Sequence, residues 1–360
     1  MARAGVAYPQ VRTTAADLAR RRVVAGRRDW DARAALDAIR ESDGDVLVIG
    51  PGRAVRRRDL ERVEAWGLSH LRVTDIAWSD LPVVTPATPE IKVRRLLMNG
   101  APLIVVRDAG GGPAGAIDSE DAAVERPALS LLHRLEPPGS RAAEERLRLL
   151  RAAGAIGESM SAPVFAVGGF VRDLLLDRPA PDVDLLVEGD GIELARRLAQ
   201  EIGGEIAVHR EFATASIQGA GLALGRIDVA SARRERYEAP GALPIVAPAP
   251  VGEDLRRRDF SVNAMAMALR PLDFGRLLDP LGGEIDLRSR RLRPLHPLSF
   301  LEDPTRIWRA ARYCSRLGFA IEPRARRAVV VAVSATHYPA LSGQRIRAEI
   351  DLLAGEPRGW

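Results

Sequence analysis

The chain has 360 residues, of which 46% are hydrophobic and 28% charged, so its composition is that of a globular protein large enough for two or three domains. Its longest apolar runs are much shorter than the roughly 20 residues that a membrane-spanning helix needs. Cys314 is the only cysteine and Lys92 the only lysine, which excludes an internal disulfide, a zinc finger and a Walker A phosphate loop.

The net charge of +5 is distributed unevenly along the chain. Residues 251–360 contain 19 arginines and 13 acidic residues, and this basic C-terminal third favours a polyanionic partner such as RNA. GC-rich codon usage is an alternative explanation of the arginine count, although it does not explain the clustering. The N-terminus lacks the apolar core of a secretory signal, so we expect a cytoplasmic protein without membrane contact.

The first region, residues 1–124, contains two copies of one pattern. Each copy reads as a helix, a buried strand, a turn, a second strand and an acidic residue at the start of another helix. The helices are expected at 31–41 and 91–99, and the first strands at 45–50 and 102–106. Asp59 and Asp121 close the two copies, so the pattern predicts an internal repeat.

This repeat resembles a pair of CBS domains in which the first copy is degenerate. In that family an acidic residue at the matching position binds the ribose of an adenine nucleotide. The resemblance therefore implies a possible nucleotide site at Asp59 and Asp121. The alternative is that both are ordinary acidic residues, favoured at a helix N-terminus by the helix dipole.

Residues 125–160 are predicted to be a connector, because a Pro-Pro-Gly break at 137–139 is followed by an amphipathic helical pattern over 141–153. Residues 161–270 read as a mixed α/β domain. Short strands are expected at 164–167, 182–187, 205–208, 213–218 and 227–230, and helices at 171–176 and 192–202. From about residue 271 to 360 the chain reads as mainly helical.

Acidic residues stand at the start of one of these strands, at Asp182 and Asp184. Residues i and i+2 on a strand point to the same face, so the two carboxylates can converge on a pair of divalent ions. Magnesium suits carboxylate, water and phosphate-oxygen ligands. Asp228 lies between apolar residues on what we expect to be a neighbouring strand, and it is the candidate third ligand.

A glycine pair, Gly168 and Gly169, follows the strand at 164–167. Glycine allows close approach of a phosphate, and the backbone amides together with the next helix N-terminus form an anion site. Arg172, in the first turns of that helix, could reach the same triphosphate. The alternative for the glycine pair is a tight strand–helix turn without a ligand.

Four segments in order, 168–184, 257–264, 278–283 and 301–309, resemble the bacterial (class II) tRNA nucleotidyltransferase/poly(A) polymerase family. The resemblance covers roughly residues 162–353. It implies a polymerase beta-like nucleotidyltransferase head with a small mixed sheet, followed by a helical neck. With the repeat, the fold class is a multidomain α/β and α+β protein. The implied activity is template-independent addition of AMP or CMP to an RNA 3′ end. The implied substrates are ATP and CTP, and the implied cofactors are two Mg²⁺ ions.

The resemblance also implies roles for individual residues. Asp182 and Asp184 would hold the catalytic metals, residues 257–263 would line the nucleotide site and tell ribose from deoxyribose, and Asp303 with Arg306 would read the Watson–Crick edge of the incoming base. The implied nucleotide-binding set is Gly168, Gly169, Arg172, Arg257, Arg258, Asp259, Asn263, Asp303, Arg306, Arg309 and Arg312.

The residue pattern around Asp303 supports this role in part. Pro304 is suited to the first position of a helix, which makes Asp303 the N-cap, and Arg306 shares its face three residues later. An Asp accepts and an Arg donates, so the pair can match the edge of a base. The alternative is that Asp303 only caps the helix and Arg306 pairs with Glu302 or Asp303.

The chain departs from the family after the neck, because the segment 342–350 is followed closely by Trp360. We therefore expect the further RNA-binding domains to be missing from this sequence. Either it is a fragment, or a partner chain or a homodimer supplies RNA binding, or the protein binds RNA weakly. The proline-rich stretch 240–250 cannot form a regular helix or a central strand, and it falls where the family has a mobile loop near the active site.

Two other functions remain open at this point. One is a non-catalytic, adenine-nucleotide-sensing regulatory protein that retains the transferase fold. The other is a nucleotidyltransferase that acts on a small molecule or a protein and is insensitive to RNA and salt. The fusion of a CBS-like pair to this head resembles long bacterial forms, some of which add only A, which favours adenylyl transfer.

Overall fold

The computed structural model describes residues 13–121, 129–135, 141–180, 182–218 and 225–356. The chain divides into two compact units, residues 1–124 and 125–360, and each is described by itself. Within the described ranges, no helix combines the length and the apolar character that crossing a bilayer requires.

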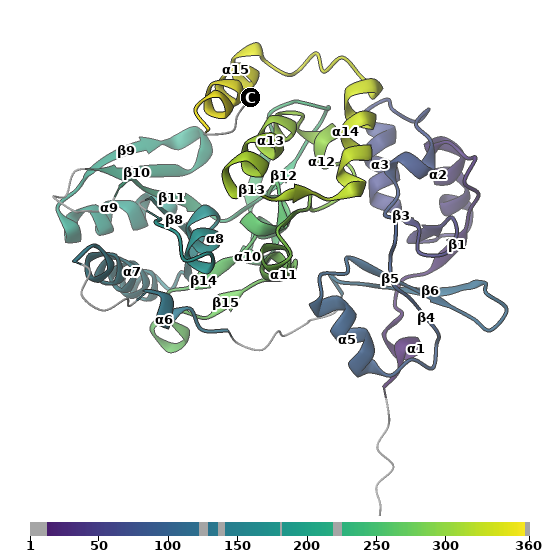
Figure 1. Ribbon diagram of the computed structural model, residues 1–360, viewed down its shortest axis with the longest axis horizontal. Coiled ribbons are helices and arrows are strands. Elements are labelled where there is room, and N and C mark those ends of the chain that lie inside the picture. The colour runs from purple at the N-terminus through teal and green to yellow at the C-terminus, as the bar shows by residue number, and fades with distance from the viewer. Residues whose placement is uncertain (1–12, 122–128, 136–140, 181, 219–224, 357–360) are drawn as a thin grey trace, which may run out of the picture. The chain divides into compact units, whose positions relative to one another are not determined.

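The first unit contains two three-stranded sheets with the same topology (Figure 1). One sheet consists of β1 (Val23–Ala25), β2 (Val46–Val48) and β3 (Ala54–Arg56), and the other of β4 (Val83–Val84), β5 (Leu103–Arg107) and β6 (Pro113–Asp118). In each sheet the first pair is parallel and the second antiparallel. A helix precedes each central strand: α2 (Ala32–Glu41) and α5 (Glu90–Met98). The internal repeat expected from the sequence is therefore present.

Apolar residues of both sheets share one core cluster, which includes Trp78 and Leu103. Arg56 and Asp118 occupy equivalent positions in the two copies, since each pairs with the first residue of its central strand. Their side chains form a buried ion pair with 2.7 Å between Nε and Oδ2. The shorter helices of this unit are α1 (Ala15–Leu18), α3 (Arg57–Ala65) and α4 (Val73–Ile76).

The second unit is built on a seven-stranded sheet with the order β15-β14-β7-β8-β11-β10-β9. Its strands are β7 (Val164–Val167), β8 (Val183–Val187), β9 (Glu205–His209), β10 (Thr214–Gln218), β11 (Ile227–Ser231), β14 (Ala266–Ala268) and β15 (Leu277–Leu278). β8 and β11 run parallel, and the other neighbouring pairs are antiparallel. The sheet is mixed, as expected, but β15 carries it past residue 270, where the sequence predicts the helical segment to begin.

Two long helices, α7 (Arg141–Ser159) and α9 (Gly191–Ile202), pack against this sheet and against each other, so they cover the same face (Figure 1). The ends of α9 follow from its sequence. The Asp190 side chain accepts hydrogen bonds from the backbone N–H groups of Ile192 and Glu193, and Gly203 adopts a φ of +75° beyond the last turn.

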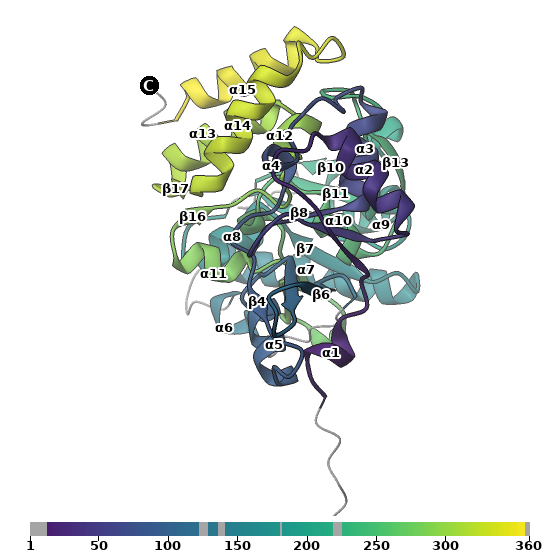
Figure 2. The same ribbon diagram turned by 90° about the vertical axis from the view of Figure 1, so that its right-hand side faces the viewer.

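The C-terminal part of this unit is mainly helical. Its helices include α13 (Thr305–Leu317), α14 (Pro323–Ala335) and α15 (Gly343–Ala354), which lie together in both views (Figures 1 and 2). The shorter helices are α6 (Leu132–Leu135), α8 (Gly169–Leu175), α10 (Val251–Arg256), α11 (Gly283–Arg288) and α12 (Ser299–Glu302), with 3₁₀ turns at 210–212, 261–263 and 271–273. Two small sheets complete the unit.

One of these small sheets is an antiparallel hairpin of β12 (Arg233–Arg236) and β13 (Ile245–Pro248). The proline-rich stretch 240–250 thus forms the second strand of a two-stranded ribbon, which agrees with its expected exclusion from a central strand position. The other small sheet pairs β16 (Arg291–Leu292) with β17 (Ala320–Ile321).

Candidate functional site

A cavity of about 580 Å³ in the second unit collects side chains from segments far apart in the sequence. The turn after β7, the start of β8, the β12–β13 hairpin, residues 257–263, and helices α13 and α15 all contribute to it. Of the predicted nucleotide-binding set, the following line this cavity: Gly168, Gly169, Arg257, Arg258, Asp259, Asn263, Asp303, Arg306 and Arg309.

Gly168 is required by both conformation and space. Its φ of +67° lies in the left-handed region, and a β-carbon there would stand 2.9 Å from Nη1 of Arg258 and 3.4 Å from Oδ2 of Asp184. The backbone of this turn therefore passes directly beside a carboxylate and a guanidinium, at the edge of the cavity.

The parallel pairing of β8 with β11 places Asp184 beside Asp228, with Asp182 immediately before β8. Burial raises the pKa of Asp184, and the negative charges of Asp228 and Asp182 raise it further, while Arg258 acts in the opposite direction. Asp184 therefore lies close enough to Asp182 and Asp228 to be influenced by their negative charges, so the three predicted metal ligands are neighbours in the fold.

The side chain of Asp228 is nevertheless committed to other partners. Its Oδ1 accepts from the Ser216 hydroxyl at 2.6 Å, and its Oδ2 accepts from Nε of Arg226 at 2.8 Å. Arg226 stands two residues earlier on the same side of the chain, which is why it reaches this carboxylate. In the described ranges no group of three or more His, Cys, Asp or Glu side chains is arranged to hold a metal ion. The role of Asp228 as a third metal ligand therefore stays a prediction, and in this conformation its carboxylate is engaged by Ser216 and Arg226.

Arg172 does not line the cavity, contrary to its expected contact with a triphosphate. Its side chain is 3% exposed, and it donates to both carboxylate oxygens of Asp173 at 2.8 Å and to Oδ1 of Asn263 at 2.7 Å. A buried guanidinium needs such partners, and the adjacent Asp173 supplies them. Arg172 orients Asn263, which does line the cavity.

Two arginines of the 257–263 segment are held by one acidic residue that sequence reasoning missed. Asp254, fully buried in α10, accepts from Nη2 of Arg257 at 2.7 Å and from Nη2 of Arg258 at 3.1 Å. Glu235 on β12 also accepts from Nη1 of Arg257 at 2.7 Å. The spacing of Asp254, three and four residues before the arginines, is the signal that could have identified it.

Asp259 is the most strongly paired acid of the cavity. Burial alone would raise its pKa, but the Arg309 guanidinium and the amide of Asn263 lower it to about 2. The amide nitrogen of Asn263 donates to Oδ1 at 3.0 Å, and Nε of Arg309 donates to Oδ2 at 2.8 Å. Asp259 therefore stays ionised and orders two other predicted site residues.

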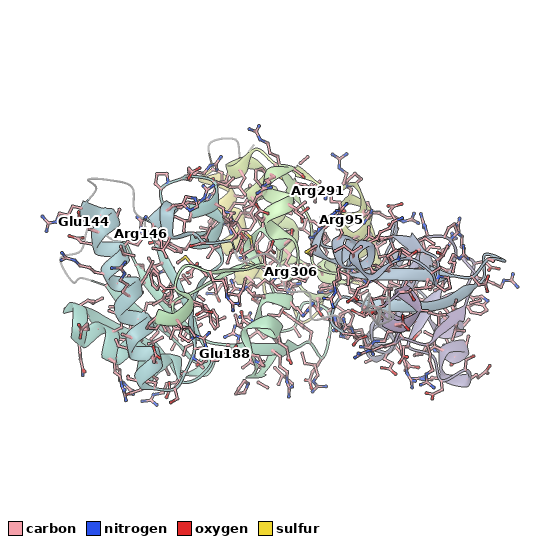
Figure 3. All side chains as sticks on the ribbon, turned by 90° about the horizontal axis from the view of Figure 1, so that it is seen from below. Arg95, Glu144, Arg146, Glu188, Arg291 and Arg306 are labelled. Carbon is pink, nitrogen blue, oxygen red and sulfur yellow. The ribbon has the colours of Figure 1, made fainter. Side chains whose placement is uncertain are left out.

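Asp303 and Arg306 both line the cavity, as expected for a pair that meets a ligand. Helix α13 begins at Thr305, so its N-cap is Pro304 and not Asp303 as predicted, although Oδ1 of Asp303 accepts from the Thr305 backbone N–H at 3.0 Å. Arg306 is 4% exposed and lies within the dense side-chain packing (Figure 3). It donates to the Ser299 hydroxyl at 2.8 Å and contacts Glu302 at 3.4 Å, so the alternative pairing with Glu302 is also present.

Arg312 turns away from the cavity, which corrects its expected contact with the nucleotide. It is 7% exposed, lies over the Tyr313 ring at 4.9 Å, and approaches Oε2 of Glu349 on α15 at 3.4 Å. Arg309, one turn earlier on α13, also lies over the Tyr313 ring, at 5.8 Å, and it does line the cavity.

Several lining residues carry no motif and were not predicted: Glu235, Tyr237, Tyr313, Arg345 and Glu349. Arg345 and Glu349 lie on α15, in the segment that sequence reasoning describes only as neck-like. Their contact with the cavity depends on how α15 packs on α13, and no local pattern reports this.

In the first unit, the two candidate nucleotide ligands have different environments. Asp59 is 3% exposed, and its Oδ2 accepts no hydrogen bond from the described residues. Asp121 is engaged by Arg21, whose Nε and Nη2 donate at 2.6 and 2.7 Å.

Residues 164–293 match the family described as the Poly A polymerase head domain. The chain is 44% identical over 209 residues to the A-adding tRNA nucleotidyltransferase of Geobacter sulfurreducens, a match covering 58% of this chain and 23% of that protein. It is 40% identical over 193 residues to the CC-adding tRNA nucleotidyltransferase of Deinococcus radiodurans, covering 53% of this chain and 50% of that protein.

The fold of the second unit is similar to that of a CCA-adding enzyme in its apo form II, with a TM-score of 0.59 and 38% identity over 65% of this chain and 54% of that one. The chain thus spans from about a quarter to about half of the length of the relatives that it matches. Together these comparisons support the nucleotidyltransferase family that the motifs indicate, with residues 164–293 matching its head domain.

Proposed function

We propose that the second unit is a template-independent nucleotidyltransferase that adds AMP, CMP or both to the 3′ end of an RNA, with tRNA as the expected acceptor. The observation that carries the proposal is the cavity itself. A glycine turn, the carboxylate of Asp184 and a row of fixed arginines line one space of a size suited to a nucleotide.

In the proposed reaction, the 3′-hydroxyl oxygen of the RNA forms a bond to the α-phosphorus of the nucleoside triphosphate, and the bond to the bridging oxygen breaks. Pyrophosphate leaves with that oxygen. Arg258, which lies beside Gly168 and is held by Asp254, is positioned to balance phosphate charge. Such transfer depends mainly on positioning and electrostatic stabilisation, which pre-oriented arginines supply.

Asp182 and Asp184 are the residues that would hold Mg²⁺. The raised pKa of the half-buried Asp184 shows a carboxylate whose negative charge is incompletely compensated, and such a site favours a divalent cation. A divalent ion held there would favour ionisation of the attacking hydroxyl and would stabilise charge on the departing oxygen. Asp228 would bind the ion as a third ligand only if its carboxylate released Arg226.

Asp303 and Arg306 are proposed to meet the edge of the incoming base. Arg306 donates to the backbone oxygen of Arg257 at 3.0 Å, so the base-facing and phosphate-facing parts of the cavity are directly connected. Adenine and cytosine both present an exocyclic amine, and a carboxylate can accept from either. The names of the relatives include both A-adding and CC-adding enzymes, so the experiment below has to distinguish ATP from CTP as the substrate.

The test uses the full chain with Mg²⁺, a tRNA lacking its 3′ end, and each nucleoside triphosphate separately. Incorporation of ATP or CTP, lost in Asp184→Asn, supports the proposal. Binding of ATP without any incorporation would favour the nucleotide-sensing protein, and transfer that is indifferent to RNA would favour a small-molecule or protein acceptor. Light scattering of the same sample tests whether a second copy contributes to RNA binding.

For the first unit we propose a CBS-like pair that takes an adenine nucleotide at Asp59. Its buried Oδ2 without a hydrogen-bond donor supports this, because a ribose hydroxyl would satisfy it. Asp121 would have to release Arg21 to act in the same way. Calorimetric titration of the chain with AMP, against Asp59→Ala as control, tests this site separately from the cavity of the second unit.

A further inference from the structure

We infer that Arg345 is a positioning residue that sets base selectivity by holding Asp303 and the β12–β13 loop in one arrangement; this inference rests on the proposed function. Arg345 belongs to none of the four family-like segments, and it reaches the cavity from α15. It is the side chain that connects the helix behind the cavity to both of these cavity walls.

The guanidinium of Arg345 has two acceptors on separate elements. Nη2 lies 3.0 Å from Oδ1 of Asp303, and Nη1 donates to the backbone oxygen of Gly241 at 2.8 Å. Arg345 itself is held at the start of α15, where its backbone N–H lies 3.4 Å from the capping hydroxyl of Ser342. A planar guanidinium with two separate donors suits this bridge, and the single ammonium of a lysine does not.

The bridge determines which oxygen of Asp303 is available. Oδ1 already accepts from the Thr305 backbone N–H at 3.0 Å and from the Thr305 hydroxyl at 2.6 Å, and it forms an ion pair with Nη2 of Arg345. Oδ2 receives no hydrogen bond from the described residues, so it is the oxygen left to accept from a ligand. With Oδ1 occupied by two hydrogen-bond donors and one cation, the carboxylate has one orientation and acts only as an acceptor through Oδ2.

The same bridge fixes the loop that forms another wall. Gly241 donates its N–H to the backbone oxygen of Glu302 at 2.9 Å while its own oxygen receives Arg345. Gly241 has a φ of +76° and packs closely on Tyr338 and Leu341. Tyr237 and Pro244, on either side of it, line the cavity. Arg345 thus couples the loop position to the orientation of Asp303.

This arrangement has a consequence for base choice. A fixed acceptor matches the exocyclic amine of adenine or cytosine and opposes the carbonyl oxygen that guanine or uracil presents at the corresponding place. If Arg345 is removed, Asp303 can rotate and the loop can move, so the penalty against the carbonyl-bearing bases decreases. The expected loss is therefore in discrimination more than in turnover.

The experiment compares the full chain with Arg345→Met, Arg345→Lys and the control Arg347→Met, whose parent side chain lies on the same helix and is 84% exposed. Two measurements are made for ATP, CTP, GTP and UTP: the dissociation constant with Mg²⁺ by calorimetry, and kcat and KM for incorporation into tRNA lacking its 3′ end. Circular dichroism confirms that each variant is folded.

We expect Arg345→Met to lower the preference for ATP over GTP by about tenfold, through a higher KM for ATP with a smaller change in kcat. Arg345→Lys should retain stability but not the preference, and Arg347→Met should match the parent chain. If a folded Arg345→Met variant keeps the preference for ATP over GTP, or if Arg345→Lys restores it fully, the proposed role of Arg345 is wrong. If the parent chain neither binds nor incorporates any nucleotide, the proposed function is overturned. If it binds nucleotides without incorporating them, the dissociation constants for ATP and GTP still test the role of Arg345.

Discussion

At the scale of single residues, the site is organised by acids that fix arginines. Asp254 holds Arg257 and Arg258, and Asp259 holds Arg309, so the cations that face the cavity have few accessible orientations. Both acids are buried, so removing Asp254 would leave Arg258 without its carboxylate partner, and removing Asp259 would leave Arg309 with only the more distant Glu349. Asp184 differs from them, since burial and its acidic neighbours raise its pKa.

The lowered pKa of Asp259 predicts an acid-dependent loss of stability. The ionised carboxylate stabilises the folded state above pH 3.8, its ordinary pKa, and this contribution disappears as the pH falls towards about 2. Asp259→Asn should therefore lower the free energy of unfolding by about 2 kcal/mol or more at pH 7, and the difference from the parent should shrink near pH 2. Urea unfolding at both pH values measures this. A constant difference, or a similar effect from the exposed control Glu238→Gln, would contradict the pairing.

The raised pKa of Asp184 predicts that replacing this acid changes the free energy of unfolding in the opposite direction to replacing Asp259. Since its charged form is disfavoured in the fold, Asp184→Asn should increase the free energy of unfolding at pH 7 when no divalent ion is present. Added Mg²⁺ should stabilise the parent chain, by about 2.7 kcal/mol at 100 times its dissociation constant, but not the variant. The same variant should lower any transfer rate on the order of 10³-fold. Denaturation with and without Mg²⁺, beside the activity assay, provides the check.

At the scale of elements, α15 is joined to α13 by charged pairs. Glu349 on α15 lies 3.3 Å from Arg309 and 3.4 Å from Arg312, and Arg316 pairs with Glu356 just beyond the helix. No side chain of α15 is fully buried, so apolar packing contributes little to its attachment. The charged pairs therefore decide where α15 lies against the cavity.

This attachment can be weakened selectively. Glu349→Ala removes the acidic partner of Arg312, which is 7% exposed, and should cost about 1–2 kcal/mol of unfolding free energy. Amide exchange should become faster along α15 and remain unchanged in the seven-stranded sheet. Asp351→Ala on the same helix, where the parent side chain is 72% exposed, is the matched control and should alter neither measurement. Equal effects of the two variants would show that Glu349 is not the anchor.

At the scale of the whole molecule, each of the two units has its own core clusters. In the first unit the repeat places Arg56 and Asp118 at equivalent positions with opposite charges, and it does the same for Arg58 and Glu120, whose nearest charged atoms lie 2.5 Å apart. The two copies are therefore complementary to each other, and two identical copies would bring like charges together.

Separate cores predict separate unfolding. Arg56→Leu leaves Asp118 buried without its cation, which should destabilise the first unit by about 3–5 kcal/mol. Calorimetry of the full chain should then show one transition moved to lower temperature and a second one unchanged. ATP binding at the cavity of the second unit should stay within about twofold of the parent, because the described residues that line it all belong to the second unit. A joint shift of both transitions would mean that the units unfold as one.

Much of this protein follows from its sequence alone. The two-residue period of strands and the turn chemistry of glycine place Gly168, Asp184 and Asp228 together at one part of a mixed sheet, and the repeated pattern in the first 124 residues predicts two sheets of equal topology. These features depend on local geometry, which short stretches of sequence report directly. They predict the glycine turn and the acidic residues on the sheet, whereas the cavity residues of 257–263 and of α13 were expected only from the resemblance to the family.

Only the tertiary structure decided which partner each charged side chain takes. Arg172 pairs with Asp173 and Arg312 with Glu349, so neither faces the cavity, and Asp228 is held by Arg226. The contribution of Arg345 depends on helix α15, about 40 residues after Asp303, lying against α13. A buried charge selects its partner by distance and burial in three dimensions, and sequence spacing carries that information only when the partners are close neighbours along the chain.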